Sequence, residues 1–355
     1  MRLSTESECV VVELRETVWR GQMSSEFNNS QRIFCDRESV IIQVFDQSGQ
    51  CGVGESSPLP GHSTEMLSDC LFNVSRLKSR FPKQIVSPSE TEAFLTETPS
   101  LQFAWETALL DLMSRRKGIS VASYLGEPQC PEIPLSVVVQ SEGEAAQRYS
   151  QGYRNLKVKV GKEGLAEEEL ALIHRLRTRF GEQITLRLDA NGAWSCAQAH
   201  EKLRKFAVFR PEFVEQPVSA MALPKLGVCA VPWAADESLS SPQLADSLLS
   251  EPVCTAFVVK PAVLGFFRAR QLALQAHAQG LGVVVSHALD GPIGLAAACE
   301  LALSLPFTTL ACGLAPHLGL SAWPQIAIAQ LEKGPLVTRS GRTGLGFTKE
   351  GIPWN

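Results

Sequence analysis

The sequence predicts an α/β protein: a (β/α)8 barrel of the TIM type joined to an α+β capping domain. Short runs rich in Val, Ile and Leu alternate with helical stretches from residue 133 to residue 313, which is typical of a parallel sheet with helical crossovers. There are eight such runs, the number of strands in a closed barrel of this kind. With 355 residues, the chain is long enough for a barrel of ~250 residues and a smaller unit.

Residues 1–130 are assigned to the capping domain. Three segments rich in Val and Ile are expected to form strands: residues 9–16, 39–45 and 51–55. Turn residues 47–50 lie between the second and third segments and predict a β-hairpin. Residues 101–115 have the apolar spacing of a helix, with Ser100 as the expected N-cap. Residues 21–32 are polar and rich in Ser and Asn, and we expect a mobile loop there.

Residues 131–334 are predicted to form the barrel. Its eight expected strands are residues 133–139, 155–160, 185–190, 213–216, 232–235, 256–260, 282–286 and 309–313. Each is followed by a helix-like segment, for example residues 166–180, 196–206, 266–279 and 291–305. The strand-like, Gly-rich residues 335–355 are expected to return to the capping domain. A doubly wound open sheet is the structural alternative, although no glycine fingerprint follows an early strand.

Composition and charge narrow the class of partner. The net charge of −4, from 33 basic and 37 acidic residues, gives no support to nucleic-acid or anionic-membrane binding. Neither a signal-peptide pattern nor a long apolar run is present. The ten cysteines are scattered without a CxxC pair, so we expect reduced thiols in a cytoplasmic protein. The expected partner is therefore a small molecule, and the oligomeric state is left open.

Polar residues stand at or near the carboxyl ends of six successive predicted strands. They are Lys157 and Lys159, Asp189, Glu215, Asp236 with Glu237, Lys260, and Ser286. The intervals from Lys159 to Ser286 fit one βα unit each. A barrel would therefore gather these groups at one mouth, where barrel enzymes have their active sites. Burying so much charge is costly unless the groups pair or bind a metal.

The three carboxylates Asp189, Glu215 and Asp236 are the candidate metal ligands. They come from consecutive strands without a soft ligand, a set that suits Mg²⁺, with Mn²⁺ as the alternative. Without a cation they would repel one another, and their pKa values would rise. Asn191 and Glu237 are candidates for supporting the metal ligands or contacting substrate, and Asn191 also fits a simple Asn-Gly turn.

Lys159 and Lys260 are the candidate catalytic bases. Their strands, the second and the sixth, lie across the barrel from one another, so the two ammonium groups would face each other over the metal. Lys157 shares the inward face with Lys159. Its charge would help keep Lys159 partly neutral; alternatively, it forms salt bridges within the barrel. Together these groups suit removal of the α-proton of a carboxylic acid, with the cation stabilising the resulting enediolate.

These motifs resemble the enolase superfamily and its muconate-cycloisomerase-like subgroup. The matching segments are Lys157-Val-Lys159, Asp189-Ala-Asn191, Glu215-Gln-Pro217, Asp236-Glu-Ser238 and Val259-Lys-Pro261. Residues 52–61, 98–101 and 186–191 are similar to one member family, the o-succinylbenzoate synthases of menaquinone biosynthesis. These are hydro-lyases that convert 2-succinyl-6-hydroxy-2,4-cyclohexadiene-1-carboxylate to 2-succinylbenzoate.

The resemblance implies a role for each lysine. Lys159 would remove the α-proton and then protonate the departing hydroxide, and Lys260 would stabilise the enediolate by a cation–π contact. Ser286 and the backbone around Gly313 would bind the succinyl carboxylate. Residues 21–32 and 57–61 of the capping domain would close over the mouth.

The stretch after the seventh predicted strand departs from the family pattern. Asp290 stands where the family more often has Glu. His287 is either a loop histidine or a substrate contact and accessory acid.

Other reactions on the same scaffold remain open: racemisation of N-succinylamino acids, epimerisation of dipeptides and muconate cycloisomerisation. A barrel that binds a carboxylate without turnover is the alternative from a different class.

Overall fold

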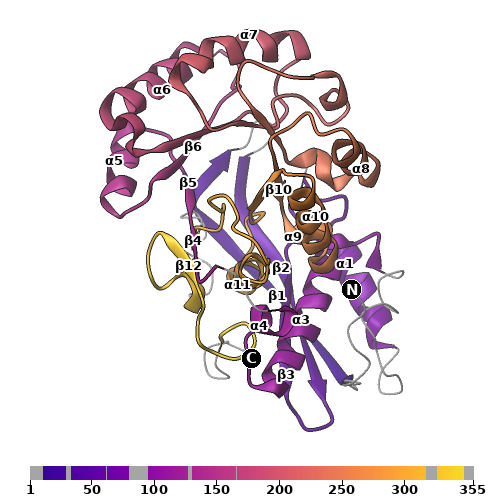
Figure 1. The fold of residues 1–355 in the computed structure, drawn as a ribbon. Coiled ribbons are helices and arrows are strands. Elements are labelled where there is room, and N and C mark those ends of the chain that lie inside the picture. Colours follow the sequence, from indigo (N-terminus) through magenta and orange to yellow (C-terminus); the bar gives the residue numbers. More distant parts are fainter. Residues whose placement is uncertain are drawn as a thin grey trace.

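The computed structural model describes residues 11–28, 33–60, 62–79, 95–126, 130–164, 166–316 and 326–347. Figure 1 shows a barrel with helices on its outside and a smaller α+β unit packed beside it. No helix in these ranges has both the length and the apolar character needed to cross a bilayer. Eight cysteines in the same ranges are free thiols, and two others, Cys9 and Cys35, lie outside the residues whose side chains are described.

The capping unit is a three-stranded antiparallel sheet covered by a long helix. Its elements are β1 (Val11–Asn28), β2 (Ile33–Asp46), β3 (Cys51–Ser56), α1 (Leu67–Lys78), α3 (Pro99–Lys117) and α4 (Val121–Leu125). The strand order is β1-β2-β3, which confirms the hairpin expected around residues 47–50. Two glycines let α3 lie directly on β3: a Cβ on Gly52 or Gly54 would come within 2.1 or 1.9 Å of a backbone oxygen of α3.

Two expectations for this region are wrong. Residues 21–28 continue β1, with Gly21 paired to Arg37 and Asn28 to Ile33, because cross-strand backbone hydrogen bonds hold a polar ribbon that the side-chain pattern does not reveal. Residues 29–32 lie outside the described residues. The N-cap of α3 is Thr98, followed by Pro99 in the first turn. The Ser100 N–H bonds instead to Glu65 Oε1 at 2.7 Å.

The barrel strands form one parallel sheet in the order β11-β10-β9-β8-β7-β6-β5. They are β5 (Ser136–Val138), β6 (Asn155–Lys159), β7 (Thr185–Asp189), β8 (Val214–Glu215), β9 (Trp233–Ala235), β10 (Ala256–Val259) and β11 (Gly282–Val285). The eighth expected strand makes two parallel bridges, Leu135 to Cys312 and Ser286 to Gly313. This segment therefore joins β11 to the start of the sheet and closes the barrel.

Helices follow most of these strands. They are α5 (Glu142–Ser150), α6 (Ala166–Phe180), α7 (Cys196–Phe206), α8 (Pro242–Ser250), α9 (Pro261–Leu264), α10 (Phe266–Ala278) and α11 (Pro292–Leu303). After β8 the chain forms only a short 3-10 helix, Leu223–Lys225, so the expectation of a helix after every strand is wrong there. Other 3-10 helices are Gly181–Gln183, Ala207–Phe209, Glu237–Ser240 and Ala329–Leu331. The apolar α11, within the expected helix-like segment 291–305, is almost wholly buried.

The C-terminal segment pairs at the other end of the barrel. There β12 (Leu336–Thr338) pairs antiparallel with β4 (Glu132–Pro134). Further on, the Leu345 N–H donates to Asp111 Oδ1 of α3 at 2.7 Å, and Arg115 Nη2 donates to the Phe347 carbonyl at 2.9 Å. This segment thus contacts the long helix of the capping unit. Residues 348–355 lie outside the described residues.

Buried carboxylates link the capping unit to the barrel helices. Glu55, at the end of β3, accepts backbone N–H groups of Gly291, Ile293 and Gly294 at 2.7, 3.1 and 2.9 Å. Glu106 of α3 accepts the N–H of Phe266 at 2.6 Å. Each carboxylate thereby meets the positive end of a helix dipole, α11 and α10 respectively. These contacts hold the capping unit over the carboxyl ends of the barrel strands.

Candidate active site

A cavity of about 380 Å³ opens among the carboxyl ends of the barrel strands. Leu59 and His62 of the capping unit contribute to its lining, and so do Lys157, Lys159 and Lys260. The loop that carries Leu59 is fastened to the barrel by Arg37. Its guanidinium donates to the Ser57 carbonyl at 2.7 Å and the Leu289 carbonyl at 3.1 Å.

Lys157 lies between two of the candidate metal ligands. Its Nζ is 3.1 Å from Asp189 Oδ2 and 3.2 Å from Glu215 Oε1. The parallel register explains this arrangement, since Lys159 is paired with Asp189 and Asp189 with Glu215. Lys157 therefore forms salt bridges within the barrel, which is the second of the two interpretations that the sequence left open.

Lys159 and Asn191 are the first members of a hydrogen-bonded chain. Lys159 Nζ donates to Asn191 Oδ1 at 2.7 Å and lies 3.5 Å from Asp189 Oδ2. Asn191 Nδ2 donates to Glu237 Oε1 at 3.1 Å, and its backbone N–H donates to Asp189 Oδ1. Asn191 has a φ of 44°, a region that Asn tolerates better than most residues. Asn191 therefore stands in a turn and contacts Asp189 as well as Lys159, and its role toward a metal or substrate stays a prediction.

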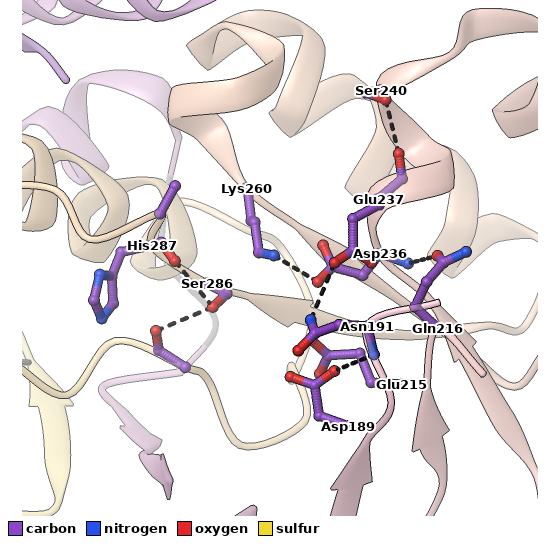
Figure 2. A network of polar contacts seen from close by, with 12 residues as sticks. Asp189, Asn191, Glu215, Gln216, Asp236, Glu237, Ser240, Lys260, Ser286 and His287 are labelled. Atoms are coloured by element: carbon purple, nitrogen blue, oxygen red, sulfur yellow. Dashed lines mark hydrogen bonds and ion pairs between the residues drawn. The ribbon is translucent and has the colours of Figure 1, made fainter. Parts of the chain in front are cut away.

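Lys260 Nζ contacts Asp236 Oδ2 at 2.5 Å. Figure 2 shows this pair, with Gln216 on the other side of Asp236. Gln216 Oε1 accepts the backbone N–H groups of Asp236 at 3.0 Å and Ser238 at 3.3 Å, which holds the end of β9. The sequence analysis did not single out Gln216, although it stands inside one of the quoted motifs.

The three candidate metal ligands have shifted pKa values: two are raised and one is lowered. Burial, together with the nearby Asp189 and Asp236, raises the pKa of Glu215 to about 8. Burial also raises the pKa of Asp236. Burial acts in the same direction on Asp189, but the surrounding lysines hold the pKa of this carboxyl well below its usual range.

The pKa values of two buried lysines, Lys157 and Lys260, are raised by the carboxylates around them. Burial lowers the pKa of Lys157, but Asp189 and Glu215 raise it above its usual range. Burial likewise lowers the pKa of Lys260, and Asp236 with Glu237 raise it. Both groups are therefore charged at neutral pH and compensate the buried carboxylates.

As the side chains lie, no three carboxylate, histidine or cysteine groups among the described residues converge tightly enough to enclose a metal ion. The ammonium groups of Lys157 and Lys260 lie against the three carboxylates instead. The donor set nevertheless fits a hard divalent cation: the oxygens are buried and lie at or next to the ends of adjacent strands. A cation would also relieve the crowding that raises the pKa of Glu215.

Ser286 and Gly313 lie side by side at the far wall of the cavity. Ser286 Oγ donates to the Gly313 carbonyl at 3.3 Å. A Cβ on Gly313 would come within 2.6 Å of Ser286 Oγ, so only glycine allows this approach. Both residues line the cavity, as the sequence analysis expected of groups that meet a substrate arm.

His287 and Asp290 have structural contacts. His287 Nδ1 accepts the Leu289 N–H at 3.1 Å, so Nε2 carries the proton and donates to the Ala315 carbonyl at 3.1 Å. Both ring nitrogens thus hold the loop, which favours the loop-histidine interpretation. Asp290 is buried away from the cavity lining. Burial and the neighbouring Glu55 raise its pKa to about 7.

Arg187 and His62 are cavity residues that the sequence analysis missed. Arg187 is 2% exposed, and its Nη1 donates to the Ala311 carbonyl at 2.5 Å. It shares the inward face with Asp189 by the period-2 alternation of β7, and that signal could have found it. Burial and the charges of Lys260 and Lys159 lower the pKa of His62 to about 4. Nothing in the barrel pattern could have indicated this capping-unit residue.

With this geometry established, comparison with known proteins identifies the family. A family model described as "Enolase C-terminal domain-like" matches residues 141–349, which is more than half of the chain. The chain belongs to the enolase superfamily. Its relatives in that superfamily are enzymes, among them epimerases, cycloisomerases and o-succinylbenzoate synthases.

Three similar proteins illustrate the range of reactions. The L-Ala-D/L-Glu epimerase of Bacillus subtilis is 30% identical over 79% of this chain and 82% of its own length, and its substrate-liganded structure superposes with a TM-score of 0.83 over 95% and 98% of the two chains. The o-succinylbenzoate synthase of Thermobifida fusca is 37% identical over 52% of this chain and 59% of its own length. A dipeptide epimerase from Methylococcus capsulatus, solved with Mg and a dipeptide, has the same fold, with a TM-score of 0.83 over 95% and 99% of the two chains at 24% identity.

Proposed function

We propose that this enzyme removes the proton from the carbon next to a substrate carboxylate, with Asp189, Glu215 and Asp236 holding a Mg²⁺ ion. The observation that carries the proposal is the placement of two lysines on opposite walls of one cavity, which Asp189 and Glu215 also line, with Asp236 paired to Lys260. Lys159 is the last residue of β6 and Lys260 directly follows β10, and these two strands are four positions apart in the sheet order. A substrate carbon between them would have an acid–base group on each face.

When bound, the cation supplies the positive charge that stabilises an enediolate. Lys159 takes the proton, and its hydrogen bond to Asn191 fixes the direction of its Nζ. Lys260 supplies further positive charge on the other side of the substrate. Lys157 stays protonated between Asp189 and Glu215 and orients both carboxylates. The capping-unit residues Leu59 and His62 exclude water from the mouth of the cavity.

The charge of the cavity lining supports a substrate with a second anionic group. Its cationic side chains are Arg148, Lys157, Lys159, Arg187 and Lys260. Apart from the candidate metal ligands, the carboxylate of the lining is Glu144, whose Oε2 already accepts the Gln140 N–H at 2.9 Å. A Mg²⁺ ion at the three carboxylates would offset the charge with which Lys157, Lys159 and Lys260 are paired, so an ammonium group of a dipeptide would then meet mostly positive charge. A succinyl carboxylate fits better, beside Ser286 and Gly313.

Within this class, the cavity charge favours the o-succinylbenzoate synthase reaction. The enzyme would dehydrate 2-succinyl-6-hydroxy-2,4-cyclohexadiene-1-carboxylate to 2-succinylbenzoate. Lys159 would remove the α-proton, and the same proton would leave with the hydroxide as water. The 37% identity to the Thermobifida fusca enzyme over half of the chain supports this reading.

Epimerisation or racemisation is the second candidate, and the length of the matches favours it over the first. Dipeptide epimerases are among the relatives that align over about four fifths of both chains, together with a chloromuconate cycloisomerase. Two lysines on opposite faces are also what a two-base epimerisation needs. The charge of the lining then points to an N-succinylamino acid rather than a free dipeptide.

The experiment that tests these candidates presents all three substrates to the same Mg²⁺-loaded protein: the cyclohexadiene carboxylate, N-succinyl-L-amino acids, and L-Ala-L-Glu. Aromatisation is followed in the ultraviolet, and epimerisation by deuterium uptake from D2O. Turnover of the diene alone supports the synthase. Deuterium uptake into the dipeptide without aromatisation would reject the synthase and the charge argument.

A further inference from the structure

A second, smaller compartment lies behind Lys260. Its volume is about 210 Å³, and Leu239, Val258, Val263 and Leu264 form its apolar wall. Its polar lining consists of His62, Asp236, Glu237, Ser240 and Lys260. We call this space the side compartment. Figure 2 shows four of its polar lining residues, Asp236, Glu237, Ser240 and Lys260.

The side compartment and the catalytic cavity share three lining residues: His62, Val258 and Lys260. The two spaces therefore meet around the Lys260 ammonium, where the proposed function places the reacting carbon. His62 comes from the capping unit and Val258 from β10, so this boundary is formed where the two units of the molecule meet. A substituent on a carbon held beside Lys260 would therefore lie next to the compartment.

The apolar wall is held firmly from outside. Val263 and Leu264 belong to α9, the short helix that begins directly after Lys260. Behind it, Gly265 packs against Gln102 of α3, where a Cβ would come within 3.2 Å of the Gln102 side chain. Glu106 of the same helix accepts the Phe266 and Phe267 N–H groups at 2.6 and 3.1 Å. The compartment is therefore preformed rather than opened by a ligand.

We propose that the side compartment is a substrate subsite for the apolar group attached to the reacting carbon, and that it accommodates groups up to a six-membered carbon ring. A buried apolar cavity of about 150 Å³ in another protein binds benzene, so this space is large enough. Water would find few partners along its apolar wall. The inference rests on the proposed function, since it places the substrate carboxylate at the candidate metal ligands.

The apolar character of the compartment can be tested without turnover. Crystals of the protein soaked in benzene should show the ring against Leu239, Val263 and Leu264. A compartment that holds no benzene would overturn the inference, because an uncharged probe needs neither the metal nor the catalytic lysines. Crystals of a Val263→Phe variant should exclude benzene from the same place.

The link to substrate binding is tested with acetate and cyclohexanecarboxylate, titrated calorimetrically into the Mg²⁺-loaded protein. The ring should strengthen binding at least about tenfold, and Val263→Phe should reduce that ratio to about twofold or less. Leu272→Ala is the matched control, since Leu272 lines a neighbouring outer groove but not the compartment, and the ratio should survive. An unchanged ratio in Val263→Phe would overturn the subsite. Benzene binding without any carboxylate binding would instead count against the proposed function.

Discussion

Lys260 Nζ lies 2.5 Å from Asp236 Oδ2, so the second candidate base is paired with the third candidate metal ligand. Lys157 stands in the same relation to Asp189 and Glu215. Removing either member of such a buried pair leaves an uncompensated charge, which costs several kcal/mol. Variants of these lysines and carboxylates should therefore be measured both with and without Mg²⁺, because the ion would bind the carboxylates that the lysines now contact.

Mg²⁺ should stabilise the folded protein. A ligand that binds only the folded state adds about 2.7 kcal/mol when present at 100 times its Kd. We expect a Tm that rises with Mg²⁺ concentration in the wild type and stays constant in Asp189→Asn. Glu201→Gln, at an exposed helix position, should keep the wild-type response. An equal response in the Asp189→Asn and wild-type proteins would contradict the assignment of the metal ligands.

Glu55→Ala should destabilise the protein by about 3 kcal/mol or more, because three buried N–H groups at the start of α11 lose their acceptor. Glu55→Gln keeps an acceptor oxygen and should lose less. Urea unfolding at neutral pH measures both, with the exposed Glu13→Ala as a control. If Glu55→Ala unfolded at the wild-type urea concentration, these hydrogen bonds would not be holding the two units together.

The raised pKa of Asp290 predicts that the free energy of unfolding depends on pH. Its folded-state pKa of about 7 lies above the ordinary value of 3.8, so it favours folding most below pH 4, and this advantage is lost as the pH rises through 7. Asp290→Asn should therefore raise the free energy of unfolding at pH 8, by at most about 4 kcal/mol, and have little effect at pH 4. Thermal melts at both values, with exposed Asp246→Asn as a control, check this. Equal effects at the two pH values would refute it.

Gly313→Ala should weaken substrate binding, because the new Cβ would meet Ser286 Oγ at 2.6 Å and displace one of the two residues. We expect KM to rise about tenfold, a cost of roughly 1.4 kcal/mol, with a smaller change in kcat. Gly143→Ala is the control, since its nearest neighbour lies at 3.9 Å. An unchanged KM in Gly313→Ala would exclude these two residues from the substrate site.

Regular βα units were predictable from the sequence because their strands are short segments rich in Val, Ile and Leu that alternate with helix-like segments. The predicted helices at residues 166–180 and 196–206 coincide with α6 and α7. The missing helix after β8 has a local cause, since Pro224, Gly227 and Pro232 interrupt that connection. The extension of β1 was not predictable, because the backbone pairing that forms it leaves no mark in the side-chain pattern.

The sequence predicted which site residues share one face of a strand. It did not predict which residues come together where the two units of the molecule dock. Periodicity placed Lys157 and Lys159 on one face, and the register then brought them to Asp189. The position of His62 depends on how the capping unit docks, which no local pattern encodes. The same is true of Glu55, whose backbone N–H partners lie more than 230 residues away along the chain.

The central claim is that Lys159 takes a proton from the carbon next to a metal-bound carboxylate. Its most direct test incubates the wild type and Lys159→Ala with Mg²⁺ and the cyclohexadiene carboxylate or an N-succinylamino acid in D2O. The account predicts Mg²⁺-dependent loss of the α-proton by the wild type, abolished by EDTA and reduced at least about 10³-fold in Lys159→Ala. Wild-type rates in Lys159→Ala, with Mg²⁺ bound, would contradict it.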